Sequence, residues 1–278
     1  MIVLFFGDVV GDRASAFLAE RLPGLRRAHG ADLVIVNAEN SAPSGLGMGT
    51  AQVDALLEAG TDVITGGNHS WDSPESVALL ALPRVLRPAN LAPGVPGRGV
   101  LHVPVGGETV TVVNLADHCA MRSVKAAKGR FRPAWDGWLE ADRRGTVIVD
   151  YHGDHVLEKQ IFAHAVDGEA AAVLGSHSHE ATSPLHLLPG GTAFVTEVGM
   201  VGPGDGVQGF APGHLVAGLR STGNPFSGPM PPVSRGPLVL GGVVVEIADG
   251  RAVRLERIEG AAPAAGSPET PGTEGAAA

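Results

Sequence analysis

The stretch Val173-Leu174-Gly175-Ser176-His177-Ser178-His179 places two histidines at alternate positions after a short apolar run. The run, residues 170–174, is typical of a buried strand, and a glycine ends it. In an extended or loop backbone, side chains at positions i and i+2 point to the same side. Because neutral imidazole is the commonest metal-ligating side chain, the pair is a candidate for metal binding. Two solvent-facing loop histidines would have the same spacing. Other motifs in the chain are therefore needed to distinguish a metal-binding pair from a solvent-facing one.

Four further apolar runs upstream are followed by polar side chains of the kinds that bind metals. The runs are residues 2–6, 33–36, 63–65 and 146–149. The groups that follow them are Asp8, Glu39 with Asn40, Asn68 with His69, and His152. Open α/β sheets place their ligand sites at the carboxyl ends of strands, which is where these groups are expected.

Each of these groups also has a purely structural explanation. Asp8 could cap a helix, Asn40 could hold a turn, and Asn68 could cap a turn beside a bystander His69. The spacing Gly7-x-x-x-Gly11 lacks the full glycine pattern of a dinucleotide loop. Suitable groups after all five strands are far less expected by chance than after any one of them, and this coincidence favours a metal site.

The mixture of ligand types indicates which metals are expected. Oxygen and nitrogen ligands together suit Mn, Fe or Zn better than Ca or Mg, which prefer oxygen alone. One carboxylate able to bridge, with about six other ligands, is enough for two ions. Two such ions can clamp the attacking and leaving oxygens of a phosphoryl displacement.

The composition bounds the class of protein. The chain has 278 residues, 44% of them hydrophobic and 18% charged, as in ordinary globular proteins. A formal net charge of −9 argues against stable binding to nucleic-acid backbones. Cys119 is the single cysteine, which excludes a disulfide framework and fits a reducing cytoplasm. No apolar run approaches the length of a membrane span, and no signal peptide is expected.

The order of the apolar runs predicts an α/β domain with strands of both directions. Helices are expected at residues 15–27, 51–59 and 157–166, and hairpins at residues 99–114, 185–196 and 239–258. Residues 202–236 are rich in Gly, Pro and Ser and predict a long irregular loop. We expect a single domain over residues 1–259. Residues 260–278 contain only Ala, Gly, Pro, Ser, Thr and Glu, which predicts a disordered tail.

Two features have alternative interpretations. The segment 116–138 is locally basic, and it is either a solvated helix face or a mobile flap that meets an anionic substrate. His155 is either an additional active-site group or a surface histidine at the start of a helix.

The order of the five motifs resembles that of the calcineurin-like metallophosphoesterases. The order is Gly-Asp, Asn-x-Glu-Asn, Gly-Asn-His, a single His, and Gly-x-His-x-His. Longer strings resemble the YmdB-type branch, the 2′,3′-cyclic-nucleotide 2′-phosphodiesterase-like proteins of bacteria. These strings are Phe6-Gly7-Asp8-Val9-Val10-Gly11, Asn37-Ala38-Glu39-Asn40, Gly66-Gly67-Asn68-His69-Ser70-Trp71-Asp72, Arg87-Pro88-Ala89-Asn90 and Gly199-Met200-x-Gly202-Pro203. The resemblance covers residues 1–258 and implies a four-layer α/β/β/α sandwich with mixed sheets.

The resemblance also implies a set of site residues. One metal ion would be held by Asp8, Glu39, Asn40 and His179, and the second by Glu39, Asn68, His152 and His177. Glu39 would bridge the two ions, which would be Fe or Mn, with Zn possible. A hydroxide bridging the ions would attack phosphorus in line, and His69 would protonate the departing sugar oxygen or bind the phosphoryl group. Glu197 stands where the branch usually has an Asp.

The function expected from this resemblance is hydrolysis of cyclic nucleotides such as 2′,3′-cAMP or 3′,5′-cAMP. The expected partner is a small-molecule phosphodiester, and no membrane partner is expected. A homo-oligomer is possible. One alternative is a phosphomonoesterase or nucleotidase on the same two metals. Another is a regulatory protein whose metals are structural. A spare proton donor such as His69 argues against the latter, because a structural site needs none.

Overall fold

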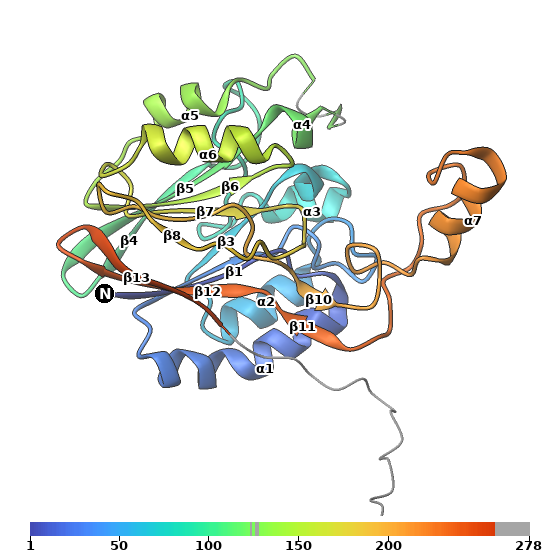
Figure 1. Ribbon diagram of the computed structural model, residues 1–278, viewed down its shortest axis with the longest axis horizontal. Coiled ribbons are helices and arrows are strands. Elements are labelled where there is room, and N and C mark those ends of the chain that lie inside the picture. The colour runs from blue at the N-terminus through green and yellow to red at the C-terminus, as the bar shows by residue number, and fades with distance from the viewer. Residues whose placement is uncertain (123, 126–127, 259–278) are drawn as a thin grey trace, which may run out of the picture.

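Two mixed β-sheets face each other at the centre of the molecule, and helices cover the outer face of each (Figure 1). The structure is a computed structural model that describes residues 1–122, 124–125 and 128–258. The first sheet has the order β13-β12-β1-β2-β3. Its strands are β1 (Ile2–Phe6), β2 (Leu33–Asn37), β3 (Val63–Thr65), β12 (Gly242–Ala248) and β13 (Arg251–Arg257). β1, β2 and β3 are parallel, and the terminal hairpin β12–β13 is antiparallel to β1.

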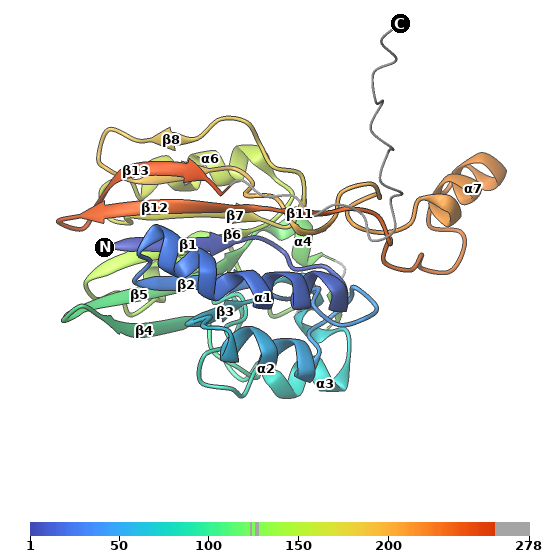
Figure 2. The ribbon, with the colours of Figure 1, turned by 90° about the horizontal axis from the view of Figure 1, so that it is seen from below.

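The second sheet has the order β4-β5-β6-β7-β9-β8. Its strands are β4 (Val100–Val105), β5 (Glu108–Ala116), β6 (Thr146–His152), β7 (Ala172–Ser176), β8 (His186–Leu187) and β9 (Ala193–Val195). β5, β6, β7 and β9 are parallel, and the outer strands β4 and β8 are antiparallel to their neighbours. A separate pair, β10 (Val201–Pro203) and β11 (Leu238–Leu240), lies beside the first sheet (Figure 2).

The helices divide between the two outer faces. On the side of the first sheet lie α1 (Gly11–His29), α2 (Thr50–Glu58), the short 3₁₀ helix η1 (Asn68–Trp71) and α3 (Pro74–Leu79). On the side of the second lie α4 (His118–Met121), α5 (Ala134–Glu140) and α6 (Val156–Ala165). None of the helices in the described residues is long and apolar enough to cross a membrane.

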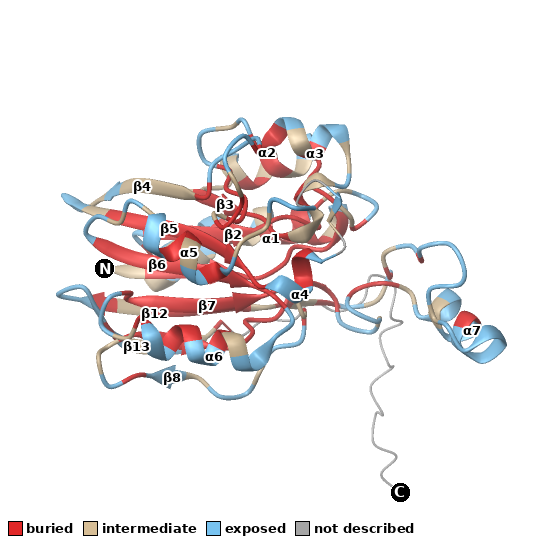
Figure 3. Ribbon diagram, turned by 90° about the horizontal axis from the view of Figure 1, so that it is seen from above, coloured by how far each residue is buried: buried red, intermediate tan, exposed pale blue. Residues whose placement is uncertain are grey.

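The alternation of side chains along each strand explains the layers. Val3 and Phe5 of β1 pack between the sheets against residues such as Ile148, whereas Leu4 and Phe6 pack outward against α1. On the other outer face, Tyr151 of β6 packs in a cluster with side chains of α5 and α6. The central strands are buried along most of their length (Figure 3). Strands buried on both faces appear in a sequence as continuous apolar runs. The predicted four-layer α/β/β/α sandwich with mixed sheets is confirmed.

The three expected hairpins are present as β4–β5, β8–β9 and β12–β13. The prediction of an irregular loop over residues 202–236 is wrong in part, because this segment contains α7 (Gly213–Thr222), which projects away from the sandwich (Figures 1 and 2). Only Gly218 of α7 is buried, and its apolar side chains Val216 and Leu219 are exposed. The glycines and prolines on either side of this short apolar stretch favoured a loop. The predicted tail, residues 260–278, lies outside the described residues.

Candidate metal centre

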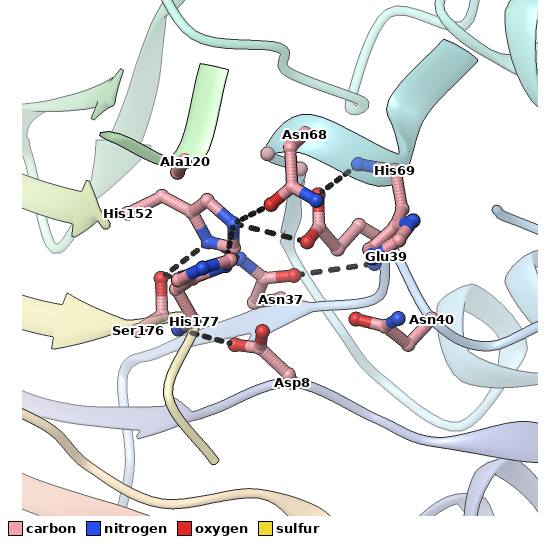
Figure 4. Close-up of polar contacts among 12 residues, drawn as sticks. Asp8, Asn37, Glu39, Asn40, Asn68, His69, Ala120, His152, Ser176 and His177 are labelled. Atoms are coloured by element: carbon pink, nitrogen blue, oxygen red, sulfur yellow. Dashed lines mark hydrogen bonds and ion pairs between the residues drawn. The ribbon is translucent and has the colours of Figure 1, made fainter. Parts of the chain in front are cut away.

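The polar groups that follow five strands meet at one edge of the two sheets (Figure 4). Asp8 follows β1, Glu39 and Asn40 follow β2, and Asn68 and His69 begin η1 after β3. From the opposite sheet, His152 is the last residue of β6, and His177 and His179 follow β7. The site is therefore built from both halves of the sandwich, at the carboxyl ends of its parallel strands.

Three of these side chains converge on the Nε2 atom of a fourth, His152. Asn68 Oδ1 lies 2.8 Å from it, Glu39 Oε1 lies 3.0 Å from it, and His177 Nδ1 also lies 3.0 Å from it. One ligand atom from each of Glu39, His152 and His177 lies within 4.8 Å of the others. These are the four residues that the resemblance assigns to the second metal ion.

The other assigned group lies around Asp8. Its Oδ2 atom is 3.2 Å from Nε2 of His179, and its Oδ1 accepts a hydrogen bond of 3.3 Å from the backbone N–H of His177. Asn40 donates its amide N–H to the carbonyl of Gly45 at 2.7 Å, which fixes the orientation of its side chain.

Three buried oxygen atoms support the interpretation as a metal site. Asp8 Oδ2, Glu39 Oε1 and Asn40 Oδ1 have no hydrogen bond of good geometry within the part of the chain that the structure describes, although a histidine nitrogen lies 3.2 Å from the first and 3.0 Å from the second. Leaving a buried polar atom without a partner costs roughly 1–3 kcal/mol, and more if it is charged. Cations would satisfy all three atoms, so the residues present fit the metals that the sequence predicts.

Gly67 keeps the space between these ligands open. A Cβ atom at this position would lie 2.2 Å from the ring of His152 and 2.5 Å from Glu39 Oε2. Any side chain would therefore occupy the place where the carboxylate and imidazole approach each other. Gly67 is explained by close approach of the backbone to the site, whereas a Cβ atom at Gly66 would meet Ser70 Oγ at 2.3 Å.

The electrostatics of the ligands reflect their mutual pairing. Burial alone would raise the pKa of Asp8 and Glu39, but hydrogen bonds and charges from His179 and His152 outweigh it and lower both pKa values. Burial alone would lower the pKa of His152, but the charges of Glu39, Asp8 and Asp150 raise it to about 9. The pKa of His179 is likewise raised, against burial, by Asp8. Without a metal ion, the ligands form ion pairs with one another.

A second layer of polar side chains orients His152. Its Nδ1 atom lies 3.0 Å from Ser176 Oγ, and that hydroxyl donates to Asp150 Oδ1 at 2.6 Å. Asn37 and Thr65 also donate to the Asp150 carboxylate. Burial raises the pKa of Asp150 to about 6. Contacts of this kind fix which imidazole nitrogen would face a metal ion. Asp150 was not among the predicted site residues, although its position directly after an apolar run was a signal for it.

A buried ion pair supports the loop that carries His177 and His179. Lys159 of α6 donates to the carbonyls of Ser176 at 2.8 Å and of Thr196 at 2.9 Å, and its Nζ lies 3.5 Å from Glu197 Oε2. Glu197 in turn accepts from the backbone N–H of Ser178 at 2.9 Å.

This support matters because the loop is held in an unfavourable backbone conformation. His177 and His179 have φ values of 104° and 65°. Non-glycine residues with such angles cost on the order of 1–3 kcal/mol each and persist only where the surroundings fix them. No sequence pattern pointed to Lys159, because a lysine on a helix is ordinarily solvated.

His69 lies beside the ligands and has its own carboxylate partner. Its Nδ1 atom is 2.5 Å from Asp72 Oδ2, and its backbone N–H donates to Glu39 Oε2 at 3.0 Å. Its side chain is 28% exposed, and it lines a pocket together with His177 and His179. Burial would lower the pKa of His69, but the hydrogen bond to Asp72 and the charge of Glu39 raise it.

The two features with alternative interpretations are on the surface. His155 is exposed and accepts a hydrogen bond from the backbone N–H of Glu158, so it caps the start of α6, as the structural alternative predicted. The described basic side chains of the segment 116–138 are exposed apart from Arg132, which pairs with Glu140 at 2.6 Å. Exposure fits both alternatives, and the described basic residues from Arg122 to Arg132 lie between α4 and α5 and not within either helix.

The sandwich with ligand groups at its strand ends defines a class of protein. A 5′-nucleotidase precursor from Thermus thermophilus shares the fold, with a TM-score of 0.56 at 14% identity over 95% of this chain and 56% of that one. The chain therefore has the fold of the calcineurin-like metallophosphoesterases and 5′-nucleotidases.

The chain belongs to the YmdB-like protein family, whose sequence profile matches residues 4–258. A Bacillus subtilis protein described as a 2′,3′-cyclic-nucleotide 2′-phosphodiesterase is 34% identical, over 93% of this chain and 96% of its own length. The crystal structure of a Mycoplasma pneumoniae protein described as a novel phosphatase has a TM-score of 0.84 at 30% identity, covering 95% of this chain and 94% of that one. The predicted family is confirmed.

Proposed function

We propose that this protein is a phosphodiesterase with two metal ions that hydrolyses cyclic nucleotides of the 2′,3′-cAMP or 3′,5′-cAMP type. The observation that supports it most strongly is the set of three buried oxygens without a well-formed hydrogen bond, on Asp8, Glu39 and Asn40, beside the histidines of the site, which suits cations. The similar Bacillus subtilis protein, described as a cyclic-nucleotide phosphodiesterase, supports the substrate class.

In this proposal, Asp8, Glu39, Asn40 and His179 hold one ion, and Glu39, Asn68, His152 and His177 hold the other. Iron or manganese fits this mixed ligand set, and zinc is possible. Such ions would act as Lewis acids on the phosphoryl group and make hydroxide available near neutral pH.

The protein's own contribution to the reaction is the supply of a proton. Hydrolysis forms a bond from water to phosphorus and breaks the ester bond to the sugar oxygen, which must then be protonated. His69 donates that proton in this proposal, and two observations support the role: it lines the same pocket as His177 and His179, and Asp72 favours its charged form.

A second candidate function is hydrolysis of phosphomonoesters on the same site. The observation in its favour is the similar Mycoplasma pneumoniae structure, which is described as a phosphatase. In either case the proposed substrate is a small-molecule phosphoester and the proposed location is the cytoplasm. A homo-oligomer is the proposed assembly.

The first experiment combines metal analysis with substrate turnover. The purified protein, supplemented with Mn, would be assayed with 2′,3′-cAMP, 3′,5′-cAMP, an aryl phosphodiester and a matched monoester. About two equivalents of metal with faster cleavage of a diester would support the phosphodiesterase. Faster cleavage of the monoester would favour the second candidate, and less than one equivalent of metal after Mn addition would overturn the metal centre.

A further inference from the structure

The segment that contains α7 forms an arm, defined here as residues 211–232, that leaves and rejoins the sandwich at one point. At its base, Phe210 and Val233 form an antiparallel bridge, and the N–H of Ala211 donates to the carbonyl of Pro232 at 2.9 Å. Figures 1 and 2 show α7 extending away from the sheets. Within the arm, α7 packs mainly on the loop that follows it, where Gly218 approaches the carbonyls of Asn224 and Pro225.

The base of the arm forms one wall of the pocket over the metal centre. The pocket has a volume of about 260 Å³. Its polar side is made by Asn40, His69, His177 and His179, which are all residues of the proposed site. Its other side is apolar and includes Phe210, Leu215, Phe226 and Met230. A molecule bound to the metal ligands would therefore extend along this apolar wall.

The chemistry of the wall indicates what it would contact. The arm contains no Asp or Glu, and Arg220 is its only Lys or Arg, although the whole chain has a net charge of −9. Phe226 and Met230 are 76% and 49% exposed even though they line the pocket, so a ligand could still cover much apolar surface. An aromatic face and a polarisable thioether suit a flat, uncharged ring. Because the arm has no carboxylates, it would not repel the phosphate group at the other end of such a ligand.

We propose that Phe226 and Met230, with Phe210 at the base of the arm, form a nucleobase subsite that positions the ester group of the substrate over the metal centre. The inference rests on the proposed phosphodiesterase function and adds that the arm selects nucleotides over other cyclic diesters. Stacking on aromatic side chains is tolerant of base identity, so the subsite accepts purines and pyrimidines.

The test compares two substrates that differ only in the base. One is 2′,3′-cAMP, and the other is methyl riboside 2′,3′-cyclic phosphate, which keeps the sugar and the diester. Phe226→Ala is expected to lower kcat/KM for 2′,3′-cAMP by about 10- to 100-fold, mostly through KM, since base stacking typically contributes this much. The base-free substrate should be cleaved by both proteins at the same rate. The affinity for 3′-AMP, measured by calorimetry, should fall by a similar factor, and this readout does not depend on turnover.

Leu219→Ala is the matched control, because Leu219 lies on the same arm, is 55% exposed and is not among the residues that line the pocket. It should leave both substrates unaffected. Equal losses with both substrates, or no loss with either, would overturn the nucleobase subsite. Equal losses in Phe226→Ala and Leu219→Ala, with a lower mass by light scattering, would overturn it in favour of an arm covered by a second copy. If the wild-type protein cleaves neither diester yet 3′-AMP binding depends on Phe226, the proposed function fails and the subsite stands.

Discussion

The carboxylate of Asp72 determines how His69 can act. A histidine at a metal site would ordinarily be discouraged from carrying a proton by nearby cations and by burial. Here the Asp72 carboxylate, 2.5 Å from Nδ1, and the charge of Glu39 raise the pKa of His69. The other ring nitrogen is then available to donate a proton to a departing oxygen.

This pairing gives a prediction for activity. His69→Ala should keep both metal ions and reduce kcat by a factor of about 10² to 10⁴, the usual contribution of a general acid. Asp72→Asn should lower the pKa of His69, because the neutral amide no longer stabilises the imidazolium. Activity that needs protonated His69 would then decline at a lower pH than in the wild type. The measurement is a pH profile of kcat with metal content checked at each point, and an unshifted alkaline limb would contradict the role.

Gly67 provides a test of the metal centre that changes no ligand. Gly67→Ala places a methyl group against the ring of His152 and Glu39 Oε2, so we expect loss of at least one equivalent of metal. Gly24→Ala is the control, because a Cβ there meets nothing within 4 Å and alanine favours the helix. Metal analysis after dialysis would distinguish them. Full metal occupancy in Gly67→Ala would show that the ions do not occupy the proposed space.

At the scale of elements, α6 and the loop after β7 act as a unit. Lys159 and Glu197 are each 2% exposed in their side chains, and together they hold the backbone of Ser176 and Ser178. Removing one partner of a buried pair leaves an uncompensated charge, which typically costs about 3–5 kcal/mol.

Lys159→Met should therefore lower the free energy of unfolding by about 3–5 kcal/mol and weaken metal binding, because His177 and His179 lose the support for their backbone conformation. The double variant Lys159→Met/Glu197→Gln should recover part of the stability, since no buried charge is left unpaired. Denaturant unfolding and metal titration measure the two effects. If Lys159→Met lowers the stability but leaves the metal affinity unchanged, the ion pair does not support the conformation of the loop that carries His177 and His179.

The elements that could be predicted from sequence are the strands that are surrounded by apolar side chains on both faces. β1, β2 and β6 are buried on both faces, so they appear as apolar runs in the sequence. The polar residues at their carboxyl ends therefore stand out as candidate ligands. α7 was not predicted because glycines and prolines surround its short apolar stretch and favour a loop. The roles of Asp150 and Lys159 depend on contacts between distant segments, such as Thr65 with Asp150 and Ser176 with Lys159, and no local pattern records such contacts.

For the whole molecule, metal binding should depend on pH in a defined direction. The raised pKa of His152, about 9 without metal, means that a proton must leave before the ring can bind an ion. Metal affinity should therefore rise with pH up to about 9, roughly tenfold per pH unit for each proton displaced. The paired His152 imidazolium stabilises the metal-free protein fully below pH 6.5, its usual pKa, and this contribution is lost as pH rises through about 9.

Raising the pH strengthens metal binding and weakens the metal-free protein. Both effects increase the difference in stability between the metal-bound and the metal-free protein. Chelation should lower the melting temperature more at pH 8.5 than at pH 6.5. At a metal concentration of 100 times Kd, each ion contributes about 2.7 kcal/mol to the free energy of unfolding. Thermal unfolding with and without chelator at the two pH values is the measurement. A melting temperature that chelation does not change at either pH would count against a bound metal.

The position of β1 has a consequence for how the protein is made. β1 pairs with β2 on one side and with β12 on the other, so that Ile2 lies opposite Glu246. At about 5–20 residues per second, the ribosome completes β12 on the order of tens of seconds after β1. Until then β1 has an unpaired edge, which is a site for association with other nascent chains. Asp8 follows that strand directly, so ions at the proposed site would be bound only after β12 has been translated.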